Sequence, residues 1–264
     1  MKFFINFDLI KNLYQKELLG RYKNSFMGAA WIFLSPISSI FIYTVILSNV
    51  VAVKIGVVDS TYSYGLYISA GIIIWTLFSN LILRCTNFFI EHAQILNKIN
   101  HSKKDLLAPI VLVYLTDFLI MTSILFFVMI FSPYTPIIYF FPLLFSVIVL
   151  CLFAISTGLL LGIFNLFNRD IGQATGVGLT FLFWATPIVY PMSILSGKVR
   201  AILEFNPLLP IIELWHRLIF FNDIQNIYSL LFNLSYPLIL SLISIVLFRY
   251  LLVKNIENIR DKFI

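Results

Sequence analysis

The sequence predicts an all-α integral membrane protein with six transmembrane helices, an N-terminal interfacial helix, and re-entrant outer helices between spans five and six. Hydrophobic residues make up 60% of the 264 residues and charged residues only 11%, whereas soluble proteins carry roughly 25% charged residues. Charge-free runs recur along the chain, and a helix needs roughly 20 largely apolar residues to cross a bilayer. Six crossings and short loops occupy residues 1–264, so we expect one transmembrane domain.

The charge-free runs place the six spans in order. Pro133, Pro136 and Pro142 divide one very long uncharged stretch into spans three and four, because proline disrupts helix interiors. The expected spans cover residues 24–53, 60–90 and 106–131, the stretch from the prolines to about 167, and residues 171–196 and 226–248.

We attribute the net charge of +6 to the orientation of the chain in the membrane rather than to binding of nucleic acid. With a cytoplasmic N-terminus, thirteen Lys and Arg residues fall on the cytoplasmic side and four on the outer side, as expected because basic residues concentrate in cytoplasmic loops. An even number of spans returns the C-terminus to the cytoplasm. The apolar patch Phe3–Phe7 is too short for a cleavable signal peptide. We expect a multi-pass protein of the bacterial inner membrane with both termini cytoplasmic.

Residues 1–24 are amphipathic. One stripe at helical spacing is apolar, and the opposite side is largely polar. The stripe contains Phe3, Phe7, Ile10, Tyr14 and Leu18, and the polar side contains Asp8, Asn12, Gln15 and Lys16. Such a helix with basic residues lies well in the membrane interface. We favour an interfacial helix over an ordinary cytoplasmic leader.

Two polar segments interrupt the spans. The cytoplasmic loop 91–105 has Ile95, Leu96 and Ile99 at helical spacing. It is either a short helix with an apolar face for a protein partner or a solvated loop with a basic edge. The outer segment 194–222 is too polar for a simple span and too apolar for a free loop, so re-entrant helices are expected there. Within it, Glu213 and Arg217 have the i, i+4 spacing of a helical ion pair.

Groups for catalysis or metal binding are sparse. The sequence has no GxxxxGK[ST] phosphate loop, and His92, His101 and His216 lack metal-ligand spacing, so we expect no metal on this chain. The two cysteines lie in apolar runs and are interpreted as packing residues. Within the spans only Arg84 and Asp117 are charged, and such charges usually pair or serve a function. A mutual ion pair and a role in a transport pathway are both open.

Several motifs, in order along nearly the whole chain, resemble the type-2 ABC exporter permeases that move O-antigen, capsule or teichoic-acid chains. The matching pieces are Arg21-Tyr-Lys-Asn-Ser-Phe-Met-Gly-Ala-Ala-Trp31 with Pro36, Ser69-Ala-Gly-Ile-Ile-Ile-Trp75 with Phe78-Ser-Asn80, Asn97-Lys98, Asn165 with Arg169-Asp170, Ala185-Thr-Pro-Ile-Val-Tyr-Pro191, Asn206-Pro207 with Glu213 and Arg217, and the tail Phe248 through Glu257 to Asp261. The chain departs from the family at Phe167-Asn168 and at Ile99-Asn-His-Ser-Lys103.

The resemblance implies a homodimer with two copies of a separate ATPase, which carries the ATP and Mg²⁺, so this chain is a transport subunit without a cofactor of its own. It implies that a lipid-linked glycan enters from the cytoplasm and passes between the two halves. The implied site residues fall into three groups. Those for coupling to the ATPase are Ile95, Leu96, Asn97, Lys98 and Ile99; those for an aromatic channel lining are Trp31, Trp75, Phe78, Phe181, Trp184 and Tyr190; those for the outer gate are Asn206, Pro207, Glu213 and Arg217.

Three other functions stay open. A type-2 exporter of a drug, lipid or other small molecule has the same architecture. A membrane glycan-processing enzyme needs acidic or histidine groups facing outward, and this chain offers few. An ion-coupled carrier works without an ATPase and normally has more acidic or histidine residues inside its spans.

Overall fold

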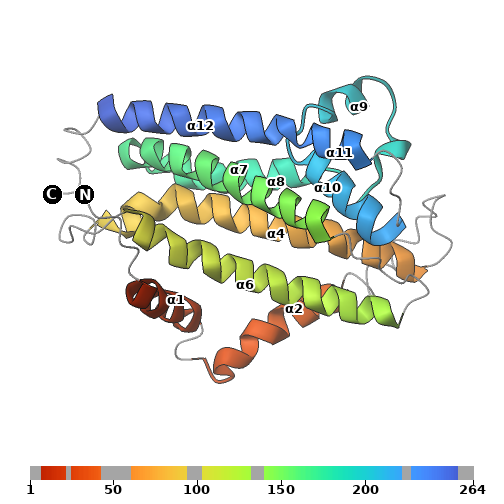
Figure 1. Cartoon of the computed structure of the whole chain (residues 1–264), viewed down its shortest axis with the longest axis horizontal. Coiled ribbons are helices and arrows are strands. Elements are labelled where there is room, and N and C mark those ends of the chain that lie inside the picture. The colour runs from red at the N-terminus through yellow and green to blue at the C-terminus, as the bar shows by residue number, and fades with distance from the viewer. Residues whose placement is uncertain are drawn as a thin grey trace.

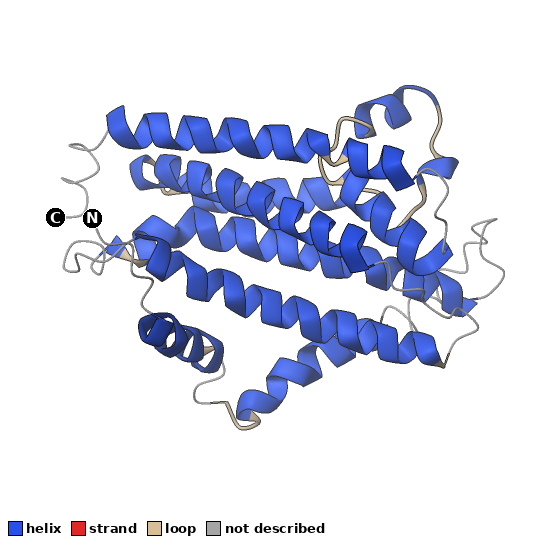
Figure 2. Cartoon of the chain, viewed as in Figure 1, coloured by secondary structure: helices blue, strands red, loops and turns tan. Residues whose placement is uncertain are grey.

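The computed structural model describes residues 7–21, 25–42, 61–93, 103–131, 140–221 and 227–254. Within those ranges all regular secondary structure is helical, as Figure 2 shows. Four helices are long and apolar enough to cross a membrane: α4 (Thr61–Glu91), α6 (Lys103–Ile130), α7 (Phe140–Phe167) and the stretch Ile227–Leu252, which joins α11 (Ile227–Asn233) to α12 (Ser235–Lys254). The all-helical membrane fold is therefore confirmed, with four of the six expected spans present as membrane-length helices.

Helix α4 is the centre of the bundle. It packs along α6 on one side and along α7 on the other, and α12 packs on α7 (Figure 1). Every residue from Tyr64 to Ile74 is buried, including Ser69, whose hydroxyl donates to the carbonyl of Gly65. A helix that is buried on all sides needs apolar residues all round, and this part of α4 is accordingly largely apolar, whereas most polar side chains of α4 follow after Trp75.

Helices α1 (Phe7–Gly20) and α2 (Trp31–Phe41) both pack against α6. The turn between them leads into η1 (Gly28–Ala30), and Gly28 has a φ of 49°, a conformation that favours glycine. The predicted helix at the N-terminus is thus present over Phe7–Gly20. Of the first expected span, 24–53, the described part is 25–42, and residues 43–53 lie outside the described residues.

The fifth span is expected within 171–196, and the helix found there is shorter than this segment. Helix α8 (Asp170–Trp184) has 15 residues, a length of about 22 Å, which is shorter than the roughly 30 Å of the hydrocarbon core. Two prolines, Pro187 and Pro191, follow its end, and the chain turns there instead of continuing as a helix. The absence of charges predicted an apolar segment correctly but did not show where the helix stops.

After this turn the chain forms short elements at one end of the bundle. They are η3 (Met192–Ile194), α9 (Gly197–Leu203), α10 (Leu209–Trp215) and the π-helical segment η4 (His216–Phe221). Figure 1 shows α9, α10 and α11 together at this end, whereas α1 and the last turn of α12 lie at the opposite end. We refer to these as the α9 end and the α1 end.

Candidate functional site

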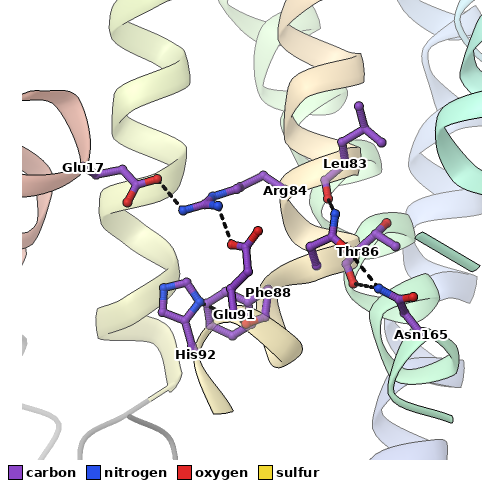
Figure 3. A network of polar contacts seen from close by, with 9 residues as sticks. Glu17, Leu83, Arg84, Thr86, Phe88, Glu91, His92 and Asn165 are labelled. Carbon is purple, nitrogen blue, oxygen red and sulfur yellow. Dashed lines mark hydrogen bonds and ion pairs between the residues drawn. The ribbon is translucent and has the colours of Figure 1, made fainter. Parts of the chain in front are cut away.

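The charged residues at the α1 end are connected in a network centred on Arg84 of α4 (Figure 3). The Nη2 atom of Arg84 lies 2.5 Å from Oε1 of Glu17, and its Nη1 atom pairs with the carboxylate of Glu91. The side chains of Arg84 and Glu17 are 25% and 27% exposed, so the pair is half-buried. Because Glu91 is the last residue of α4 and Glu17 belongs to α1, the guanidinium ties the two helix ends together.

The prediction of a mutual ion pair between Arg84 and Asp117 is wrong. Asp117 of α6 pairs instead with Arg21, whose Nη1 atom lies 2.6 Å from Oδ2 of Asp117. The guanidinium of Arg21 also lies 4.4 Å from the centroid of the Tyr114 ring, a cation–π contact. Both intramembrane charges found in the sequence therefore have partners from α1 and the residue after it, which periodicity within the spans could not reveal.

Three residues near the end of α1 hold it against the bundle. Tyr14, Glu17 and Arg21 follow one another at intervals of three and four residues, so they share one side of the helix. The hydroxyl oxygens of Tyr14 and Thr116 lie 3.0 Å apart. Sequence reasoning missed Glu17 and Arg21 as site residues. Their common spacing with Tyr14 was the available signal, but it does not identify the partner.

The residues proposed to contact an ATPase lie outside the described residues. Ile95, Leu96, Asn97, Lys98 and Ile99 all fall in 94–102, between the end of α4 and the start of α6. The structure does place the segment before this loop beside the Arg84 network, because Glu91 and the stacked ring pair Phe88–His92 precede the loop directly.

A second connection at the α1 end joins three helices through Asn165. Its Nδ2 atom donates to the carbonyl of Thr86 at 3.1 Å and to Oδ1 of Asn87 at 3.0 Å, and its Oδ1 accepts from the backbone N–H of Gly172 at 2.9 Å. The space at position 172 is tight, because a Cβ there would lie 3.0 Å from Oδ1 of Asn87 and 3.2 Å from Asn165, so a larger residue would require these side chains to shift. Asn165 therefore fixes α4, α7 and the start of α8 to one another.

The aromatic residues expected to line a channel fall into two groups. Phe181 and Trp184 of α8 are 73% and 63% exposed, and Trp31 of α2 is 38% exposed. Tyr190 is half-buried, and its hydroxyl donates to the carbonyl of Trp184 at 2.7 Å. These four side chains are accessible in the single chain, so their role as a lining stays a prediction.

The two predicted lining residues that belong to α4 are less exposed. Phe78 is 1% exposed and stacks on Phe153, with 5.7 Å between ring centroids. Its assignment to a channel surface is therefore wrong, because α7 covers it within the chain. Trp75 is half-buried and packs edge-on against Phe183 of α8 at 5.4 Å.

The outer segment is fixed at its first proline by Asn206, which is buried. Its Nδ2 atom donates to the carbonyl of Ala185 at 3.0 Å and to Oγ1 of Thr186 at 2.7 Å. Its Oδ1 atom accepts from the backbone N–H of Leu208 at 2.9 Å, across the intervening Pro207. One amide thus joins the end of α8 to the start of α10.

Helix α10 packs against both α4 and α7, and η4 packs against α4, rather than lying free on the surface. Their apolar residues are nearly all buried, and Nε1 of Trp215 donates to Oγ of Ser146 on α7 at 2.9 Å. The buried ring of His216 stacks on Tyr67 of α4, with 3.7 Å between ring centroids. A π-helical turn at this place is notable because such turns often occur at functional sites.

A cavity of about 460 Å³ opens beside α10 at the α9 end, and Glu213 and Arg217 both line it. Burial raises the pKa of Glu213, while the nearby positive charges of Arg217 and Arg200 act in the opposite direction. The predicted ion pair between Glu213 and Arg217 stays a prediction.

With this arrangement described, comparison with known proteins identifies the family. The sequence profile of the ABC-2 type transporter family matches residues 8–220. The chain belongs to this family. It is therefore a multi-pass membrane subunit of a transporter and not an enzyme.

Three curated relatives share a name. Two proteins of Klebsiella pneumoniae, each called O-antigen export system permease protein RfbA, are 26% and 27% identical over 221 and 223 residues. Both alignments cover 83% of this chain and 83% of the relative. A protein of the same name from Myxococcus xanthus is 25% identical over 204 residues, which is 76% of this chain and 75% of that protein.

Proposed function

We propose that this chain is the permease subunit of an ATP-driven exporter that moves a lipid-linked polysaccharide of the O-antigen type across the inner membrane. The observation that carries the proposal is the agreement of three relatives, each named an O-antigen export permease, over three quarters or more of this chain. The family assignment supports the transport class.

In this proposal two copies of the chain form the pathway, and two copies of a separate ATPase bind at the α1 end, which faces the cytoplasm. The exposed aromatic residues of α8 and α2 face the pathway. Aromatic faces contact the C–H faces of sugars without a fixed hydrogen-bond pattern, so a glycan can slide along them. Segment 194–222 forms the outer gate, with α10 entering the membrane from outside and protected from lipid by α4 and α7.

The Arg84 network connects the start of the loop 91–105 to α1. Movement of the ATPase against Lys98 shifts the end of α4, and the ion pairs of Arg84 pass this shift to α1. The start of α8 follows, because Asn165 ties it to α4.

The deciding experiment is to delete the gene in its host and restore it on a plasmid. We expect the deletion to abolish surface glycan and to cause lipid-linked glycan to accumulate in the cytoplasmic leaflet. The plasmid should restore surface glycan. Purification of the tagged chain should recover an ABC ATPase. Unchanged surface glycan combined with sensitivity to a drug would identify a small-molecule exporter instead.

A second experiment tests the coupling loop. Replacing Lys98 and Ile99 by alanine should abolish export while the protein inserts at normal levels. Replacing Lys198 by alanine, in α9 at the opposite end of the bundle, serves as the control. Export that survives both changes in the loop would contradict the coupling role.

A further inference from the structure

Two of the proposed gate residues, Glu213 and Arg217, line the cavity at the α9 end, but closing a gate does not require a cavity there. Its volume of about 460 Å³ falls within the range of small-ligand pockets. Its wall comes from α9, α10, η4, α11 and α12. The residues that fix the gate, Asn206, Trp215 and His216, do not line it. We call this cavity the α9–α12 pocket.

The charges of the α9–α12 pocket balance. Two arginines, Arg200 and Arg217, and two glutamates, Glu204 and Glu213, line it. At the rim, Nε of Arg200 lies 3.1 Å from Oε1 of Glu204, and each of these side chains is 53% exposed. Glu213 and Arg217 are half-buried and belong to α10 and η4. Two positively charged hydrogen-bond donors and two negatively charged acceptors therefore line the same pocket.

The opposite wall adds ring faces and neutral polar groups. Phe232 of α11 is 75% exposed, and Tyr236 of α12 follows it by four residues. The hydroxyl of Tyr236 donates to the carbonyl of Phe205 at 3.0 Å, which fixes the ring at the pocket. Asn233 and Ser235 lie between these two rings in sequence and also line the pocket.

This set of groups excludes most ligand classes. The two carboxylates repel a simple anion, and the two guanidinium groups repel a simple cation. A wholly apolar ligand would bury charges without partners, which is costly. A neutral molecule with many hydroxyl groups satisfies every group, because hydroxyls donate to carboxylates and accept from arginines, while aromatic rings cover the C–H face of a sugar.

We propose that the α9–α12 pocket binds one or two saccharide units of the exported glycan after they leave the outer gate. This inference rests on the proposed function, since it assumes that the transported chain is a glycan. Weak binding at the α9 end keeps the emerged part of the glycan from sliding back between successive cycles of ATP hydrolysis. Arg200 and Glu204 contact hydroxyl groups, and Phe232 contacts a sugar face.

The test uses the permease–ATPase complex in lipid nanodiscs. The probe is the oligosaccharide released by mild acid from the surface glycan of the host strain, and its binding is measured by saturation-transfer NMR. The variant R200A/F232A alters two exposed residues, so the fold should be retained. The matched control is K198A/Y228A, because Lys198 lies on the same helix as Arg200 and Tyr228 is an 85% exposed ring one turn before Phe232.

We expect R200A/F232A to bind the oligosaccharide about tenfold more weakly, and the control within about twofold of the wild type. Surface glycan made with R200A/F232A should be shorter or less abundant. Equal binding by R200A/F232A and the control overturns the inference. So does a change only in the phospholipids that co-purify, which would assign the pocket to a zwitterionic lipid headgroup.

The two levels of proposal can fail separately. If the wild-type gene does not restore surface glycan to the deletion strain, the proposed function fails, and this inference fails with it. If the wild type restores surface glycan and R200A/F232A binds and exports like the wild type, only the pocket assignment fails.

Discussion

Arg84 and Glu17 lie 67 positions apart in the sequence, and their side chains meet at 2.5 Å between Nη2 and Oε1. This contact fastens the N-terminal helix to the helix that leads into the loop 91–105. An amphipathic helix that only floated in the interface would need no such partner. The position of α1 is therefore set by contacts within the protein.

Replacing Arg84 by glutamine should loosen α1. Glu17 and Glu91 would face each other without the guanidinium between them. Hydrogen bonds to charged groups contribute about 1.5–3 kcal/mol, and partial exposure reduces this effect. We expect amide hydrogen exchange in residues 7–20 to become about tenfold faster, with α7 unchanged. R249Q, at an exposed arginine of α12, is the control and should leave α1 as it is.

Exchanging the charges of Arg21 and Asp117 tests the second pair. The single variants R21D and D117R each place two like charges together and should lower the unfolding temperature of the purified protein. The double variant R21D/D117R restores an opposite pair. We expect a coupling energy of about 1 kcal/mol but incomplete recovery, because the contact of Arg21 with Tyr114 is lost. Additive effects of the two changes would show that the pair is not formed.

The sequence predicts the long helices well because a bilayer imposes a simple rule. Residues 60–90 and 106–131 were expected as spans, and α4 (Thr61–Glu91) and α6 (Lys103–Ile130) are close to these bounds. Charges are costly in lipid, so their absence marks a segment that enters the membrane. The same rule did not show where α8 ends, because an apolar segment can stop being helical where the protein itself buries its backbone, as at Thr186–Ile188.

The partners of the charged residues could not be predicted. Asp117 and Arg84 lie on adjacent helices, which favoured a mutual pair. The choice between Arg21 and Arg84 depends on where α1 docks, and that position rests on contacts spread over α6, such as the one between Tyr14 and Thr116. The burial of Phe78 was missed for a similar reason, because the residues around Phe78 do not show which side of α4 is covered by α7.

The buried hydrogen bond between Trp215 and Ser146 should stabilise the packing of α10 against α7. The variant S146A leaves the indole N–H without its partner in a buried place, at a cost of about 1–3 kcal/mol. W215F removes the donor as well. The double variant S146A/W215F should therefore be less destabilised than the sum of the two single variants. Thermal unfolding in detergent measures all three, and strict additivity would contradict the contact.

Asn206 should be essential for a closed outer gate. N206D keeps the acceptor for Leu208 but loses both donors, and it places a carboxylate near the carbonyl of Ala185. We expect normal insertion, loss of export, and leakage of small outer-membrane-permeant dyes. N168D is the matched control, because Asn168 uses its oxygen to accept from the N–H of Asp170, and aspartate can do the same. Normal export by N206D would show that the amide donors are dispensable.

The close approach of α4 and α7 should make Gly158 intolerant of any side chain. A Cβ at position 158 would lie 2.6 Å from Cβ of Cys85 and 3.0 Å from the carbonyl oxygen of Ile82, so G158A has to push the helices apart. Overpacking of this kind costs about 1–3 kcal/mol, which outweighs the roughly 1 kcal/mol that alanine gains over glycine in a helix.

The control for Gly158 is G176A on α8, where the nearest atom to an added Cβ is Cδ2 of Leu83 at 3.9 Å. This variant should be neutral or slightly stabilised in thermal unfolding, whereas G158A should unfold at a lower temperature. C85G in the G158A background removes the closest clashing atom, so the double variant should recover part of the loss even though Cys85 is itself a buried packing residue. If C85G lowers the stability of G158A as much as it lowers that of the wild type, the two helices do not meet at these residues.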